Sequence, residues 1–127
     1  MTKPLSVRER LLKRSGVISK IEVRLDKETI LEVHEIKPER IEALRGYCKK
    51  DGEVDLVRLR ALMIVESVHA DGERLIDQHT KEALDTMDDI EVVNKLFKSG
   101  EQQRLYEAIS EAMGYGDPDE EVEELKN

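Results

Sequence analysis

The segment Ala61-Leu62-Met63-Ile64-Val65 contains only apolar residues, in a chain of which 39% of the residues are charged. A helix through this segment is apolar around its whole circumference, and such a helix is stable in water only when other elements cover it. Asp55 precedes the segment with a carboxylate that can cap a helix, and the helical pattern continues to about Val68. The sequence therefore predicts a buried central helix over residues 55–68.

The spacing of apolar residues indicates four further helices between Pro38 and Met113. Each has its apolar residues three or four positions apart, which places them on one face of a helix. They are a helix from Pro38 to about Asp51-Gly52, one over residues 73–84, one from Thr86 or Asp89 to Phe97, and one from Ser99 to Met113. In the first turn of the last helix, Ser99 and Gln102 have capping-box spacing. His79 falls on the apolar face of the second of these helices, and we expect it to be a core histidine.

Residues 17–36 have the period of a β-hairpin instead. Ile21, Val23 and Leu25 alternate with polar residues, and a polar turn separates them from the β-branched run 29–36. Two strands alone are barely stable, so we expect helices to cover one face of the hairpin.

A short basic helix precedes the hairpin. Ser6 and Glu9 have capping-box spacing, and Gly16 is placed to end the helix. Its narrow apolar stripe consists of Val7, Leu11 and Leu12, and most of its other residues are basic. A helix of about ten residues is marginal alone, so it must dock on another surface. Two interpretations remain open: the stripe binds a partner, or it packs on its own domain.

The predicted fold is therefore α+β and mostly helical, with an N-terminal helix and β-hairpin followed by a compact bundle of about five helices. We expect residues 1–115 to form a single domain. Residues 116–127 carry six acidic side chains and one basic side chain. They have too few apolar residues to offset the entropy of ordering, so we expect a flexible, disordered acidic tail. The tail either binds a partner, leads to a further segment, or only solubilises the chain.

The side chains that catalysis or metal binding requires are scarce. Cys48 is the single cysteine, which excludes an internal disulfide and a cysteine-cluster metal site, and its place on a helix face indicates packing. His69 and His79 lie ten residues apart across a turn, which matches no common zinc spacing. The sequence contains no glycine-rich phosphate loop, nucleophile elbow or calcium loop. We therefore expect no enzymatic activity, no metal site and no cofactor.

Charge and hydropathy limit which partners and which cellular compartment the sequence predicts. The net charge of -8 disfavours general binding to nucleic-acid phosphates, although residues 1–27 carry eight basic and three acidic side chains. No apolar run approaches the roughly 18 residues of a membrane span, and residues 1–16 lack the apolar stretch of a signal peptide. These features and the single cysteine predict a cytosolic protein that does not associate with membranes.

Three segments in the second half of the chain resemble a known family. They are residues 62–68 (LMIVESV), residues 92–97 (VVNKLF) followed by Ser99-Gly100-Glu101, and residues 105–109 (LYEAI) closed by Gly114-Tyr115. Together they resemble the XkdN-like tail assembly chaperones of tailed phages, and most closely those of Bacillus prophages. The resemblance extends from about Pro38 to Tyr115. Lys98 and Ser99 depart from it, since the family usually has Leu-Pro at these positions.

The resemblance implies a non-enzymatic chaperone in the cytosol of a bacterial host. Such proteins bind the long helical tape measure protein and keep it soluble while tail tube subunits polymerise around it. In several phages a ribosomal frameshift near the end of the gene fuses the chaperone to a second domain. The expected partners are therefore the tape measure protein, the tail tube protein and a frameshifted longer form of the chain itself.

A chaperone for such a partner needs an apolar surface, because burial of apolar groups supplies the affinity. The candidate partner-binding residues are the stripe of the N-terminal helix and exposed members of the last two helices, namely Val7, Leu11, Leu12, Val92, Phe97 and Tyr106. For Phe97 and Tyr106 the alternative is ordinary core packing.

Two other functions remain open. One is a structural completion or connector component of the virion tail. The other is a small nucleic-acid-binding regulator that uses the basic residues 1–27. The second is disfavoured, because no aromatic residue that could stack on a base precedes Tyr47.

Overall fold

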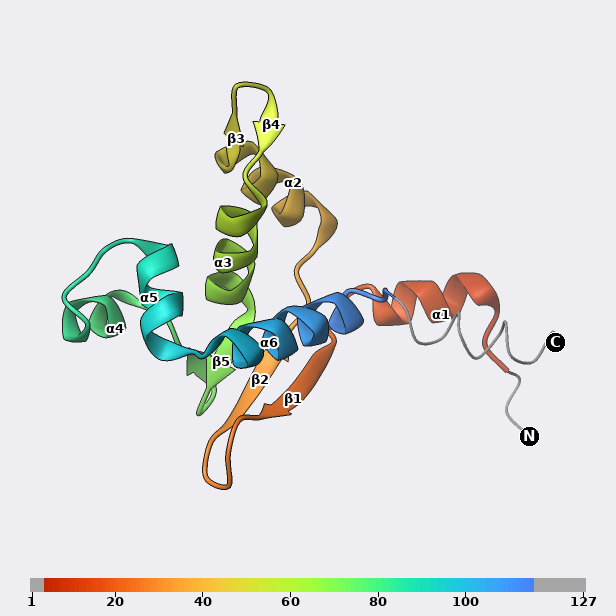
Figure 1. Cartoon of the computed structure of the whole chain (residues 1–127). Coiled ribbons are helices and arrows are strands. Elements are labelled where there is room, and N and C mark those ends of the chain that lie inside the picture. Colours follow the sequence, from red (N-terminus) through yellow and green to blue (C-terminus); the bar gives the residue numbers. More distant parts are fainter. Residues whose placement is uncertain (1–3, 116–127) are drawn as a thin grey trace, which may run out of the picture.

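The computed structural model describes residues 4–115, and Figure 1 shows how their elements are arranged. In chain order these elements are α1 (Val7–Arg14), β1 (Lys20–Arg24), β2 (Ile30–His34), α2 (Pro38–Tyr47), β3 (Lys49–Lys50), β4 (Glu53–Val54), α3 (Leu56–Ser67), β5 (Val68–Ala70), β6 (Glu73–Arg74), α4 (Gln78–Ala83), α5 (Asp89–Leu96) and α6 (Ser99–Ala112). Helices hold most of the residues in elements, which confirms the α+β, mostly helical class. The predicted disordered tail, residues 116–127, lies outside the described residues.

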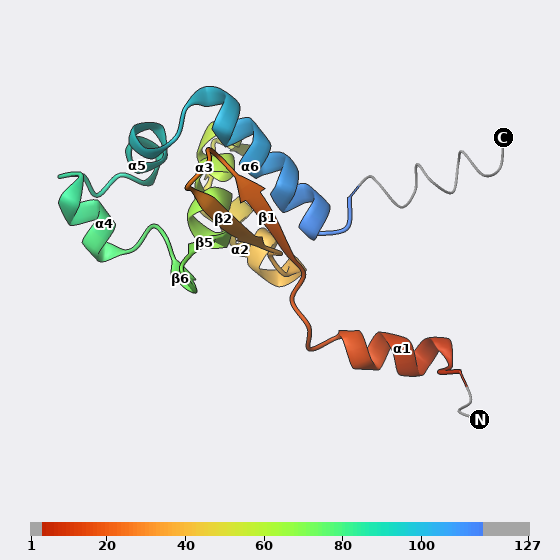
Figure 2. The same cartoon turned by 90° about the horizontal axis from the view of Figure 1, so that it is seen from below.

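The predicted β-hairpin is confirmed and forms one edge of a larger sheet. β1 pairs antiparallel with β2, and the register places Ile21 opposite Val33 and Val23 opposite Leu31. These four side chains point to the same face, which α6 covers (Figure 2). The turn between the strands is held by Asp26, whose carboxylate accepts from the amides of Glu28 and Thr29 at 2.9 and 2.8 Å.

The predicted central helix is also confirmed. α3 packs against α2, α5 and α6, and it buries Leu59, Ala61, Met63, Ile64 and Ser67. Leu62 and Val65 are only half-buried, so α3 is not enclosed on every side as the sequence predicted. The physical reason is that none of the elements within residues 4–115 covers the side of α3 between α2 and α4, where a cleft opens.

Two tight hairpins occur where the sequence predicted only the ends of helices. Asp51-Gly52 joins β3 to β4, and Asp71-Gly72 joins β5 to β6. All four residues have positive φ, between 53° and 83°, which is the backbone of the two-residue turn that best matches the twist of paired strands. β5 also pairs with β2, so the sheet has four strands in the order β1-β2-β5-β6. The prediction that residues 73–77 are helical was therefore wrong.

The prediction of a compact bundle of five helices is correct in number and wrong in packing. Five helices, α2 to α6, follow the first hairpin in the described part of the chain. However, α4 begins only at Gln78, where Asp77 caps it, and it buries none of its residues. His79 is exposed, so the prediction that it is a core histidine was wrong. The apolar residues that anchor this segment are Leu75 and Ile76, which precede the helix.

The last two helices begin at Asp89 and Ser99, as expected, but the residues that cap them differ from those expected. Asp88, rather than Thr86 or Asp89, caps α5 by accepting from the amide of Ile90 at 3.1 Å. Lys98 precedes α6, and its amide donates to the Glu101 carboxylate at 2.9 Å. The residue whose side chain reaches back to the start of the helix is therefore Glu101 and not Gln102. Both helices turn apolar residues toward the core, Val92, Val93 and Phe97 from the first and Leu105, Ala108 and Ile109 from the second.

Replacement of Asp55 by alanine is expected to lower the free energy of unfolding by about 1 kcal/mol, within a range of about 0.5–2 kcal/mol for such caps. The Asp55 carboxylate accepts from the amide of Arg58 at 3.1 Å and thereby satisfies one of the free amides at the start of the central helix. Urea unfolding followed by circular dichroism measures the change. Asp55→Asn, which retains an acceptor, serves as the control; if it destabilises as much as Asp55→Ala, the cap is not the cause.

Candidate partner-binding surfaces

The N-terminal helix α1 projects away from the rest of the fold (Figure 2). The predicted capping box is present: the Glu9 amide donates to Ser6 Oγ at 3.1 Å, and the Ser6 amide donates to Glu9 Oε1 at 3.4 Å. The helix buries none of its residues. Its apolar stripe is open to solvent, with Val7 74%, Leu11 49% and Leu12 66% exposed. Within the described residues, the stripe is therefore not packed into the core of its own domain.

The other faces of α1 are strongly basic. The helix carries four basic side chains, Arg8, Arg10, Lys13 and Arg14, against the single acid Glu9. Lys13 and Arg14 lie in the last turn, where they also complement the negative end of the helix dipole. In the described part of the chain, none of these four basic groups takes part in an ion pair. The helix thus offers an apolar stripe flanked by positive charge that is not neutralised by the described residues.

A cleft of about 460 Å³ lies between the end of α1 and the end of α6. Leu11 and Arg14 line it from α1, and Ala112, Met113 and Gly114 line it from the other side. It connects the exposed stripe to the point at which the chain leaves its last helix. The apolar side chains of Leu11 and Met113 make this cleft part of the same candidate surface.

A second and larger cleft, of about 580 Å³, opens beside α3. Its apolar residues are Leu44, Leu62, Val65 and Ile76, and charged residues of α2, α3, β6, α4 and α5 surround them. The exposed ring of Tyr47 also lines it. This cleft is where the incomplete cover of α3 leaves apolar surface accessible.

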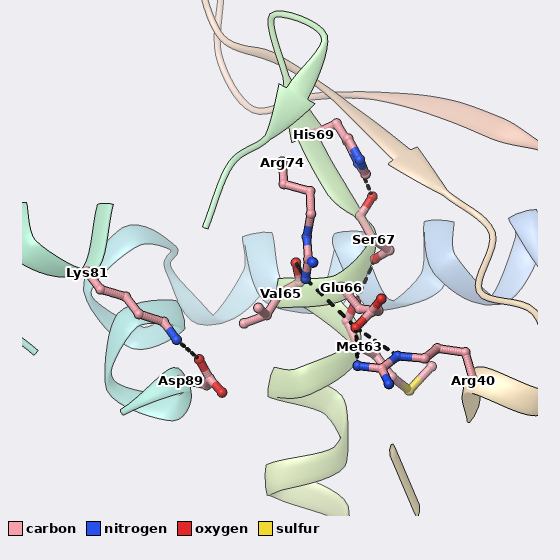
Figure 3. Close-up of polar contacts among 9 residues, drawn as sticks. All are labelled: Arg40, Met63, Val65, Glu66, Ser67, His69, Arg74, Lys81 and Asp89. Atoms are coloured by element: carbon pink, nitrogen blue, oxygen red, sulfur yellow. Dashed lines mark hydrogen bonds and ion pairs between the residues drawn. The ribbon is translucent and has the colours of Figure 1, made fainter. Parts of the chain in front are cut away.

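The charges around the second cleft are engaged with one another (Figure 3). Glu66 Oε1 accepts from Arg40 Nη2 at 2.8 Å and from Arg40 Nε at 3.1 Å, and Arg74 Nη2 lies 3.8 Å from the same oxygen. The hydrogen bond and the charge of Glu66 raise the pKa of Arg40. Lys81 Nζ lies 2.9 Å from Asp89 Oδ1 and links α4 to α5. These pairs hold the elements around the cleft together.

The open face of the sheet carries a pair of histidines that sequence reasoning missed. His34 of β2 and His69 of β5 stack with ring centroids 3.6 Å apart and an angle of 6° between the planes. His34 Nε2 lies 2.6 Å from Glu32 Oε1, and this hydrogen bond lowers the pKa of Glu32. Only the pairing of β5 with β2 brings the two rings together, so no local spacing could have indicated them. No group of three or more metal-ligating side chains occurs here or elsewhere in residues 4–115.

The predicted candidates on the last two helices are mostly internal. Val92 is 0% and Phe97 6% exposed, so the expectation that they are exposed was wrong. The reason is that α5 packs directly on α3, which places Val92 in the core together with Val93. For Phe97 the core-packing alternative is therefore correct.

Tyr106 lies at the edge of the core between α3 and α6. It is half-buried, and the guanidinium of Arg60 lies 4.7 Å from the centre of its ring. Such a contact stabilises by about 0.5–1 kcal/mol at exposed sites. Tyr106 also lines a small hollow of about 250 Å³ with Gln102 and Gln103, so part of the ring can be reached from outside.

Cys48 is fully enclosed, as predicted for a small packing residue. Burial raises the pKa of its thiol, which keeps it protonated and unreactive near neutral pH. Among residues 4–115, no helix has both the length and the apolar character needed to cross a bilayer.

Comparisons with known proteins agree with this fold. The chain is similar in structure to the crystal structure of the protein YqbN, with a TM-score of 0.67 and 21% sequence identity over 90% of this chain and 100% of that one. At this identity the likeness shows a shared fold alone. A search of curated protein sequences gave no significant match.

One family matches almost the whole chain. The family described as "Phage XkdN-like tail assembly chaperone protein, TAC" matches residues 8–126, which include nearly all of α1, the sheet, the helices and the acidic residues beyond α6. The match therefore extends well beyond the three segments on which the sequence resemblance rested. The chain belongs to the phage XkdN-like tail assembly chaperone family.

Proposed function

We propose that this chain is a non-enzymatic tail assembly chaperone that binds the tape measure protein in the host cytosol through the exposed stripe of α1. By covering an apolar face of that protein it keeps the protein soluble until tail tube subunits assemble around it. A frameshifted longer form of the chain, in which residues 116–127 lead to a further domain, is part of the same proposal.

The observation that carries the proposal is the exposure of α1. A short helix has no stability of its own in water, yet this one has a complete capping box and none of its residues is buried in the domain. An amphipathic helix with an uncovered stripe is suited to pack against one or more helices of another protein. Its positive flanks add attraction for acidic residues beside the apolar face of the partner.

The size of the stripe suits a transient complex. Full burial of one aliphatic side chain contributes roughly 1.5–3 kcal/mol, so Val7, Leu11 and Leu12 together contribute about 4.5–9 kcal/mol before the costs of association. A dissociation constant near 1 μM corresponds to about 8 kcal/mol. Because association itself costs at least about 4 kcal/mol, one copy of α1 supports an affinity weaker than this. A chaperone that must release its partner to the growing tail needs such a reversible contact.

The test is co-expression with the tape measure protein of the same gene cluster, followed by pull-down through a tag on this chain. We expect the fraction of tape measure protein in the soluble lysate to rise when this chain is present, and the two proteins to co-purify. A tape measure protein that stays insoluble and is not retained would contradict the proposal.

The alternative of a virion component is distinguished by mass spectrometry of purified phage particles. A structural tail component remains in the particles, whereas a chaperone is absent from them. The same induced cells, analysed before particle purification, give the mass of any frameshifted product.

A further inference from the structure

The last described residues leave the fold directly beside α1. α6 ends at Ala112, and Gly114 follows with φ 92°, a left-handed conformation that turns the chain out of the helix. Met113 and Gly114 line the same cleft as Leu11 and Arg14 of α1. The segment 116–127 therefore starts within reach of the exposed stripe.

The composition of this segment is complementary to α1. The helix carries four basic side chains and one acidic side chain, and the segment carries one basic residue, Lys126, and six acidic ones, namely Asp117, Asp119, Glu120, Glu121, Glu123 and Glu124. Its two apolar residues, Val122 and Leu125, are three positions apart, the spacing of neighbours on one face of a helix. The segment therefore has negative charge that complements the basic side chains of α1, and a small apolar face that complements its apolar stripe.

We propose that residues 116–127 dock in cis on α1, with their carboxylates against its basic side chains and with Val122 and Leu125 against the Val7, Leu11 and Leu12 stripe. Twelve residues reach up to about 40 Å when extended, and an eight-residue helix is about 12 Å long, so the segment can cover all of α1. The docked segment shields the stripe from wrong partners and from other copies of the chain.

The docking is weak enough for a partner to displace it. Exposed ion pairs are each worth about 0–1 kcal/mol and are screened by salt. A short tether raises the effective concentration of the segment to the millimolar range, which makes a weak contact sufficient in cis. A binding partner that buries the whole stripe gains more than the two apolar residues of the segment provide. The segment therefore acts as a competitor that sets the threshold for partner binding, a consequence that rests on the proposed function.

The contact itself is testable without any partner, by paramagnetic relaxation enhancement in the full chain. Asn127→Cys provides the attachment point for a nitroxide, while Cys48 is buried and stays unlabelled, which mass spectrometry of the labelled protein checks. The matched control is the same labelled chain with all six acids of residues 117–124 replaced by Asn or Gln. This control keeps the length of the tether and removes its six negatively charged side chains.

We expect a loss of peak intensity at the amides of residues 7–14 that exceeds the loss in the control. We also expect the excess to disappear at about 1 M salt, where the screening length is about 3 Å. Equal broadening in both chains, or stronger broadening on the open face of the sheet than on α1, would overturn the proposal. A mixture of nitroxide-labelled chain with ¹⁵N chain that carries no nitroxide distinguishes docking within one chain from docking between two copies. Broadening in the mixture that is as strong as in the nitroxide-labelled ¹⁵N chain assigns the contact to a second copy and overturns docking in cis. Because this experiment contains no tape measure protein, a negative result does not contradict the chaperone proposal. Failure of the co-expression test likewise does not contradict the docking of residues 116–127 on α1.

Discussion

Leu105→Ala is expected to lower the free energy of unfolding by about 2–5 kcal/mol, the range for leucine deletions in a packed core. Leu105 lies in the middle of α6 and is fully buried, at the place where this helix covers the sheet and packs on α3. The loss combines the transfer energy of the removed carbon atoms with the cavity that remains, because the other residues of the same core cluster cannot collapse fully into the space.

Leu12→Ala is the matched control for this variant. It removes the same atoms from a helix, but Leu12 is exposed on α1, so its effect is expected to stay within about 0.5 kcal/mol. Urea unfolding of the two variants and the parent, followed by circular dichroism at equal protein concentration, gives the comparison. If both variants lose similar stability, α1 is part of the core and the exposed stripe is not available to a partner.

The elements with strong local signals could be predicted from the sequence. The apolar run around Ile64 predicted α3, the alternation of Ile21 and Val23 predicted β1, and the three- or four-residue spacing of apolar side chains over residues 99–113 predicted α6. In each case the pattern itself reflects the burial, because one face of the element must leave water for the fold to be stable. The three sequence segments that resembled the chaperones consist of the same kind of core and capping residues.

The strands β5 and β6 were missed because their stability comes from distant residues. β5 has three residues and no alternation of its own, and it exists because β2 provides hydrogen-bond partners more than thirty residues earlier in the chain. Asp71-Gly72 was nevertheless a readable signal, since Asp-Gly between short runs favours a two-residue hairpin. Once these residues form a turn, the following apolar pair Leu75 and Ile76 is no longer part of a helix, and α4 is short and exposed.

The candidate surface could be predicted only in part. The stripe of α1 was found because a basic amphipathic helix is visible in the sequence, but periodicity does not say whether such a stripe is covered. Val92 and Val93 are neighbours on α5, and both are buried because α3 covers a wide face of this short helix. The stacked rings of His34 and His69 depend on strand pairing, which is a property of the tertiary structure.

A double substitution, Leu11→Asp with Leu12→Asp, is expected to weaken binding to the tape measure protein by at least about tenfold, since tenfold corresponds to only about 1.4 kcal/mol. The variant replaces two of the three apolar side chains of the stripe with carboxylates that cannot be buried without a partner charge. Because none of the residues of α1 is buried, the thermal unfolding of the domain is expected to change little. Binding is measured by the retained fraction in the pull-down, and unfolding by circular dichroism.

The control for this variant places the same two charges elsewhere. Leu56 and Val57 are adjacent, exposed apolar residues in the first turn of α3, where acidic side chains favour the helix dipole. Leu56→Asp with Val57→Asp is therefore expected to retain both the thermal transition and the tape measure protein. Loss of binding in both variants would mean that added negative charge alone weakens the complex. A large fall in the melting temperature of the α1 variant would instead mean that α1 is part of the core of the domain. The partner surface would then have to be sought at the cleft beside α3, where Leu62 and Val65 remain accessible.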